Sequence, residues 1–202
     1  MGQAEHKAPY TVAEYLALEA QSEVRHEYFE GEIFAMAGES VAHNVLTGNI
    51  YTACRQALRG KGCRVVMEGV QLAVKENRHY TYPDVMVSCD PADQREARTL
   101  RSPVLLVEVL SPSTAAYDRA LKFNSYKELE SLRHYLLVSQ HYWLIEWYRR
   151  EADNKWVHAA LTEATDIVEI PELSLTFTLA QVYEEAGVAP LHAAPASPDE
   201  LA

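Results

Sequence analysis

Two acidic residues stand beside apolar runs that are typical of buried β-strands. Asp84 follows Pro83, and Glu108 interrupts the apolar run Val104–Leu110. Because proline removes a ladder donor, Pro83 suits the start of a strand, where Asp84 could also serve simply as a turn acceptor. Burying an unpaired carboxylate is costly. Glu108 therefore needs a metal, a cation or several hydrogen-bond donors.

A lysine on the helix expected after the second strand completes the group. Lys122 lies one turn after Asp118 and one turn before Tyr126, so the three share a helix face. Two carboxylates and an amine can hold a divalent cation and prepare water for attack on a phosphodiester. The alternatives are a buried ion pair between Lys122 and Glu108, and an exposed Asp118–Lys122 pair of little energetic value.

Two further residues are candidates for the same chemistry. His43 lies near the start of a long predicted helix, where it could act as a general base, contact substrate or simply pack. Glu27 precedes Tyr28 and Phe29 on a predicted hairpin strand and could supply a third carboxylate, although surface exposure is the commoner fate of such a glutamate.

The helices and strands that must position these residues are predicted from the spacing of hydrophobic residues and from capping and turn residues. Thr11 and Glu14 fit a capping box, Ser40 can cap a helix reaching about Arg59, and residues 26–36 predict a hairpin turning at Glu30–Gly31. Further helices are expected over 115–130 and 179–185, and strands over 63–68, 70–75, 82–88, 103–110, 134–139, 142–149 and 155–161. This order predicts a mixed sheet flanked by helices, of the α/β or α+β class.

Length and composition bound the protein class. The 202 residues, 48% of them hydrophobic, predict one domain over 10–186 between a flexible segment, 1–9, and a disordered Ala/Pro-rich tail, 187–202. The net charge of −11 disfavours tight non-specific DNA binding. Three cysteines without metal-binding spacing indicate reduced, mostly buried thiols in a cytoplasmic protein. No segment predicts a signal sequence or a membrane span.

One long string of residues resembles a known family. It comprises Arg25–Gly31 (RHEYFEG), Met36–Gly38 with His43, Tyr82–Asp84 (YPD), Val107–Thr114 (VEVLSPST), and Asp118, Lys122 and Tyr126. This string is similar to that of the Uma-two family, restriction-endonuclease-like proteins of the PD-(D/E)XK nuclease superfamily that are widespread in bacteria. The resemblance runs from about Tyr10 to Val182.

The resemblance implies a fold, a cofactor and roles for residues. It implies a restriction-endonuclease-like mixed central sheet flanked by helices, with Mg²⁺ held by Asp84, Glu108 and the backbone carbonyl of Val109, and with Mn²⁺ as a possible substitute. Glu27 would match an early acid of the superfamily, and His43 a histidine typical of the family. The superfamily's usual lysine position holds Leu110 here, and Lys122 looks like its migrated replacement.

The expected function is therefore Mg²⁺-dependent hydrolysis of DNA phosphodiester bonds by an endonuclease. Two other functions remain open: a nuclease-fold protein that binds or regulates without turnover, and a hydrolase of small phosphoesters. The superfamily is often dimeric, and the aromatic strand predicted over 142–148 could be an exposed edge, which predicts a possible homodimer.

Overall fold

The computed structural model describes residues 9–36, 38–76, 78–111 and 115–191. Its helices are α1 (Val12–Glu19), α2 (Val41–Ala57), α3 (Ala115–Tyr117), a π-helical turn (Asp118–Lys122), α4 (Phe123–Tyr126), a 3₁₀ turn (Pro171–Leu173) and α5 (Leu179–Tyr183). The flexible segment predicted before Pro9 and the tail predicted beyond residue 191 lie outside the described residues. Residues 187–191 are described, and Trp143 donates its backbone N–H to Ala189 O at 3.1 Å.

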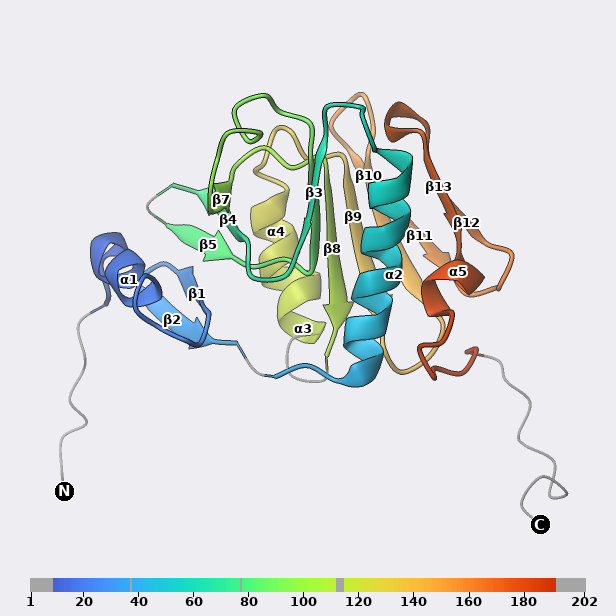
Figure 1. Ribbon diagram of the computed structural model, residues 1–202, viewed down its shortest axis with the longest axis horizontal. Helices are drawn as coiled ribbons and strands as arrows, with labels where there is room; N and C mark the ends of the chain where they lie inside the picture. Colours follow the sequence, from blue (N-terminus) through green and yellow to red (C-terminus); the bar gives the residue numbers. More distant parts are fainter. Residues whose placement is uncertain (1–8, 37, 77, 112–114, 192–202) are drawn as a thin grey trace, which may run out of the picture.

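A six-stranded mixed sheet forms the centre of the molecule (Figure 1). Its order is β11 (Trp156–Leu161), β10 (Ile145–Arg150), β9 (His134–Ser139), β8 (Leu105–Leu110), β6 (Val85–Ser88) and β3 (Arg64–Met67). Strands β8 and β9 are parallel, and their neighbours pair antiparallel. Both central strands are fully buried, as expected for apolar strands covered on two faces.

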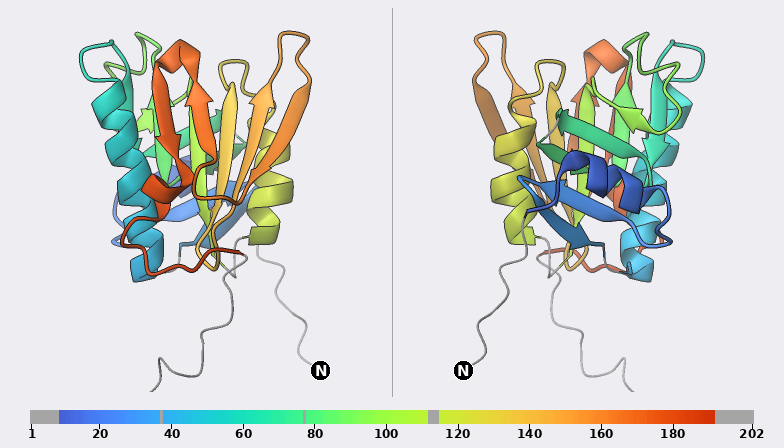
Figure 2. Two further views of the ribbon diagram at one scale, coloured as in Figure 1. Left: turned by 90° about the vertical axis from the view of Figure 1, so that its right-hand side faces the viewer. Right: turned by 90° about the vertical axis from the view of Figure 1, so that its left-hand side faces the viewer.

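Helices lie on both faces of this sheet (Figure 2). Strand β8 contributes alternate side chains to the cores on the two faces. Leu105, Val107 and Val109 pack into the core formed with α2, α5 and the hairpin of β12 (Ile167–Ile170) and β13 (Leu175–Thr178). Leu106 and Leu110 pack into the second core, which contains Tyr126 of α4. Glu108 shares the parity of Leu106 and Leu110, so it faces the layer that carries Lys122 and Tyr126.

A second sheet lies beside the α4 layer. Its order is β2 (Glu32–Ala35), β1 (His26–Phe29), β5 (His79–Thr81), β4 (Gln71–Lys75) and β7 (Thr99–Leu100). Helix α1 packs on it through Tyr15, which stacks on Tyr28 with ring centroids 5.1 Å apart. This sheet places β1 and the β5–β6 connection next to the central sheet.

The fold class and the elements with clear capping or turn residues agree with the predictions from the sequence. The mixed α+β architecture is confirmed, with a central sheet flanked by helices. The Thr11–Glu14 capping box forms, and Ser40 caps α2. The β1–β2 hairpin turns at Glu30 and Gly31, whose φ values of 49° and 96° fit a turn that needs positive φ at both positions.

Two predicted features are wrong in detail, and one element was not predicted. The strand predicted over 82–88 starts only at Val85, because Pro83 separates β5 in one sheet from β6 in the other. The strand predicted over 142–149 is not an edge: β10 lies between β9 and β11, which pairs with it from residue 156 to residue 161. That edge therefore cannot support a dimer, and a homodimer stays a prediction without this argument. The β12–β13 hairpin was not predicted.

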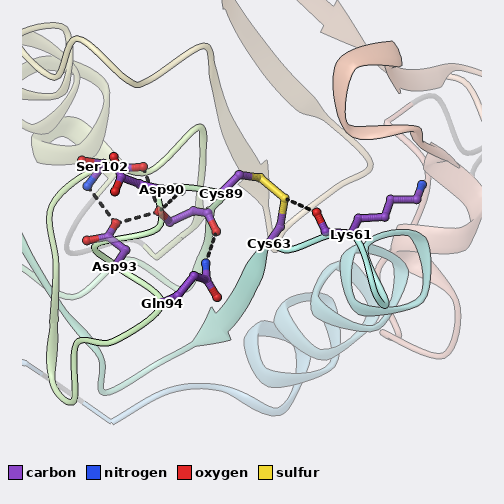
Figure 3. The surroundings of a disulfide bond; sticks show 8 residues. Lys61, Cys63, Cys89, Asp90, Asp93, Gln94 and Ser102 are labelled. Atoms are coloured by element: carbon purple, nitrogen blue, oxygen red, sulfur yellow. Dashed lines mark hydrogen bonds between the residues drawn. A yellow bond between two sulfur atoms is a disulfide. The ribbon is translucent and has the colours of Figure 1, made fainter.

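The predicted reduced state of the cysteines is also wrong. Cys63 and Cys89 form a disulfide (Figure 3). Cys54 is free and buried. The cause is strand register: Arg64 of β3 pairs with Ser88 of β6, which places the next residues outward, Cys63 and Cys89, opposite each other. Cysteine usage therefore no longer supports a cytoplasmic location. No helix in the described ranges has the length and apolarity that a bilayer crossing requires.

Candidate active site

Asp84 stands where the chain crosses from the second sheet to the central sheet. Because Val85 pairs with Val107 across β6 and β8, the residue before Val85 lies beside the residues that follow Val107. The backbone N–H of Val109 donates to Asp84 Oδ2 at 2.6 Å, and the Asp84 side chain is buried. The strand pairing thus fixes the carboxylate of Asp84 next to the Glu108–Val109 segment.

Glu108 is held from the helical layer. Tyr126 donates its hydroxyl to Glu108 Oε1 at 2.8 Å, and Lys122 Nζ donates to the same oxygen at 3.2 Å. Thr81 Oγ1 lies 3.0 Å from the Tyr126 hydroxyl and links this group to β5. Glu108 is 3% exposed, so its partners replace water almost completely.

Lys122 gathers three carboxylates around one amine. Its Nζ lies 2.9 Å from Glu27 Oε1, 3.2 Å from Glu108 Oε1 and 3.2 Å from Asp118 Oδ1. Three acceptors match the three donors of an ammonium group. The turn that carries Asp118 and Lys122 is π-helical, with the Phe123 N–H reaching Asp118 O, and such turns occur often at functional sites.

Burial and charge shift the acid–base properties of this group. Burial raises the pKa of Glu108 well above its ordinary value; Lys122 opposes this shift, and neighbouring carboxylates add to it. Burial disfavours the charged amine of Lys122, but Glu108, Glu27 and Asp118 outweigh that effect and raise the pKa of Lys122 above its ordinary value. Lys122 is therefore a permanent cation at neutral pH.

His43 joins the group from the first turn of α2. Its backbone N–H is capped by Ser40 Oγ at 3.1 Å, which fixes the helix start. The His43 Nε2 atom lies 3.3 Å from Asp84 Oδ2, and Nδ1 contacts a carboxylate oxygen of Glu39. Burial disfavours the imidazolium, but these two carboxylates outweigh it and raise the pKa of His43 to about 10.

One cavity brings all the predicted residues together. It has a volume of about 740 Å³, and Glu27, His43, Asp84, Glu108, Val109 and Lys122 all line it. Six carboxylates line the same cavity, and its cationic side chains are Lys122 and His43. The structure therefore places the predicted residues in one strongly acidic cavity.

The sequence interpretation missed Glu39. Glu39, His43 and Asp84 each offer a ligand atom within 4.8 Å of the others. Within the described part of the chain, these three side chains form a group that could hold a metal ion. Glu39 precedes the helix and is the least buried of the three. The available signal was its position directly before the N-cap Ser40, close in sequence to His43 in the first turn of α2.

Comparisons with known proteins agree with the fold and show the family. The chain shares its restriction-endonuclease-like α+β fold with a solved structure described as a putative nuclease belonging to DUF820 from Anabaena variabilis. The match has a TM-score of 0.73 and 19% sequence identity, and it covers 87% of this chain and 98% of that one. Residues 12–181 match the profile of the Uma2 family, described as "putative restriction endonuclease", and the chain belongs to this family, as the residue string predicted.

Two similar proteins come from Synechocystis sp. The uncharacterized protein slr1290 is 37% identical over 170 residues, which are 84% of this chain and 89% of that protein. The uncharacterized protein sll1609 is 33% identical over 149 residues, which are 73% of this chain and 84% of that protein. The similarity thus extends over most of each chain.

Proposed function

We propose that this protein is a Mg²⁺-dependent endonuclease that hydrolyses phosphodiester bonds of DNA, and that Mn²⁺ can replace Mg²⁺. The observation that carries the proposal is the convergence of buried Asp84, Glu108 and Lys122 on one cavity. Membership of a family described as "putative restriction endonuclease" supports the choice of a nuclease over other hydrolases.

The donor set suits a hard divalent cation. Asp84 and Glu108 offer carboxylate oxygens, which Mg²⁺ prefers, and the Val109 carbonyl is the third ligand in the proposal. Burial raises the pKa of Glu108, neighbouring carboxylates add to the shift, and a bound cation would favour the charged form of Glu108. When bound, the cation supplies Lewis-acid polarisation of the phosphodiester and makes water a better nucleophile.

The protein's own residues have distinct tasks in this scheme. Lys122 is charged and cannot accept a proton from water, so we assign it the neutralisation of charge on the reacting phosphate. Tyr126 and Lys122 fix the Glu108 carboxylate by hydrogen bonds to one oxygen, which leaves its other oxygen for a ligand. Val109 fixes Asp84 in the same way through its backbone N–H.

A plasmid-nicking assay tests this proposal. The wild type should nick supercoiled DNA with Mg²⁺ and should not with EDTA, and Glu108→Gln and Asp84→Asn should each lose roughly a thousandfold in rate or more. Glu32→Gln, which changes another carboxylate of the same cavity, is the matched control and should keep most activity. Cleavage of bis(p-nitrophenyl) phosphate without nicking would favour the small-phosphoester function. DNA binding without any cleavage would favour the binding or regulatory function.

A further inference from the structure

His43 is positioned as a ligand rather than as a surface side chain. It is 3% exposed and Asp84 is 6% exposed, whereas the Glu39 side chain is 35% exposed at the cavity wall. Two buried donors and one more open donor leave room for further ligands on the cavity side. Such open coordination is typical of catalytic rather than structural metal sites.

The backbone position of His43 is fixed from outside the cluster. Ser40 accepts the His43 backbone N–H, and the Ser40 hydroxyl in turn donates to Gln140 Oε1 at 2.5 Å. The buried His43 Nδ1 has a Glu39 carboxylate oxygen against it but no hydrogen bond of acceptable geometry. His43 Nδ1 is thus a buried polar atom without a well-formed hydrogen bond, next to a carboxylate that could bind the same cation.

We propose that Glu39, His43 and Asp84 form a second cation site that shares Asp84 with the Asp84–Glu108 site and selects a first-row transition ion over Mg²⁺. The selectivity follows from the ligands. Imidazole nitrogen suits transition ions, whereas Mg²⁺ takes oxygen ligands and keeps its waters. The proposal deepens the proposed function, on which its catalytic meaning rests, but binding of the ion does not require turnover.

The charge of the cavity supports a second cation. Six carboxylates line the cavity together with Lys122 and His43, so a formal excess of four negative charges remains when every carboxylate is ionised and the imidazole is protonated. One divalent ion would offset half of that excess, and a phosphodiester would still meet net repulsion. With an ion on the imidazole nitrogen His43 is neutral and the excess is five, of which two divalent ions would offset four, so an anionic substrate would meet less repulsion than with one ion.

Mn²⁺ is the probe, because pulsed electron paramagnetic resonance detects nitrogen bound to it. The wild type should bind two Mn²⁺ per chain, with a ¹⁴N coupling from one imidazole, and one Mg²⁺ per chain by calorimetry. Glu39→Gln should bind one Mn²⁺ and lose the ¹⁴N coupling. Glu108→Gln should also bind one Mn²⁺ but keep that coupling. Glu128→Gln, which changes a surface carboxylate paired with Lys75 outside the cavity, is the control and should match the wild type.

Two outcomes would overturn the proposal. One is the absence of ¹⁴N coupling in the wild type at saturating Mn²⁺, which would leave His43 as an imidazolium between two carboxylates. The other is a Glu39→Gln variant with unchanged Mn²⁺ stoichiometry and affinity. Parallel nicking assays separate this proposal from the nuclease function: nitrogen-coupled Mn²⁺ without cleavage would reject the nuclease alone, and cleavage without nitrogen coupling would reject the second site alone.

Discussion

Replacing Lys122 with methionine would remove the cation that three buried carboxylates share. Glu27, Glu108 and Asp118 are each at most 7% exposed, and no solvent would replace the lost amine. Removing one partner of a buried ion pair costs about 3–5 kcal/mol, because it leaves uncompensated charge. Methionine has similar length and fills the same space, so the loss would report charge rather than a cavity.

Urea unfolding measures this effect. With an unfolding slope of about 2 kcal/mol per molar urea, the midpoint of Lys122→Met should fall by roughly 1.5–2.5 M near pH 8. The matched control is Lys75→Met, because Lys75 pairs with Glu128 on the surface at 2.9 Å with both side chains about half exposed. Such pairs contribute about 1 kcal/mol or less, so the control midpoint should hardly move.

The pH dependence gives the reasoning a second test. Without Lys122, the folded pKa of Glu108 rises further above its unfolded value. A raised folded pKa stabilises at low pH, and that stability is lost as the pH rises through the folded pKa. Lys122→Met should therefore be less destabilised near pH 5 than near pH 8. A midpoint shift no larger than that of Lys75→Met at both pH values would refute the charge argument.

Three other changes have expected outcomes. Cys63→Ser removes a crosslink that closes a loop with a sequence separation of 26, which should lower stability by about 3 kcal/mol in urea unfolding and abolish any further effect of reductant. Burial lowers the pKa of His79 from 6.5 to about 4, so the unfolded chain binds a proton before the folded protein does, and the free energy of unfolding should fall as the pH drops from 6.5 to 4. His79→Gln should weaken this dependence of the unfolding free energy on pH, and an unchanged dependence would contradict the prediction. Tyr126→Phe removes the hydroxyl bonded to Glu108 and should cost about 1–3 kcal/mol by the same unfolding measurement, whereas an unchanged midpoint would show that water replaces the bond.

The sequence carried most of the information about the two central acids. Glu108 stood out because a carboxylate in an apolar run needs partners, and the structure supplies Tyr126 and Lys122. Asp84 was predicted because Pro83 suits the start of a strand. In the structure, Pro83 and Asp84 lie in the connection between β5 of one sheet and β6 of the other. The common helix face of Asp118, Lys122 and Tyr126 was also predicted from spacing alone. Lys122 contacts Asp118, and Lys122 and Tyr126 both donate to Glu108.

Features that depend on pairing between distant segments were beyond the sequence. The Cys63–Cys89 disulfide requires the register of β3 against β6, and a register is set by the whole sheet rather than by either cysteine. The inner position of β10 likewise depends on β11, whose alternation is weak. Glu39 was missed because a glutamate before a helix is usually a surface residue. It gains a candidate role only because Asp84, from a distant part of the chain, lies close to it and to His43.

The most direct test of the account is a calorimetric Mg²⁺ titration of the wild type, Asp84→Asn and Glu108→Gln, with plasmid nicking measured on the same preparations. We expect the wild type to bind Mg²⁺ and to nick DNA, and both variants to lose binding and nicking together. A wild type that binds no Mg²⁺ or Mn²⁺ even with DNA present would contradict the account, because Asp84 and Glu108 would then be structural partners of Val109, Lys122 and Tyr126 alone.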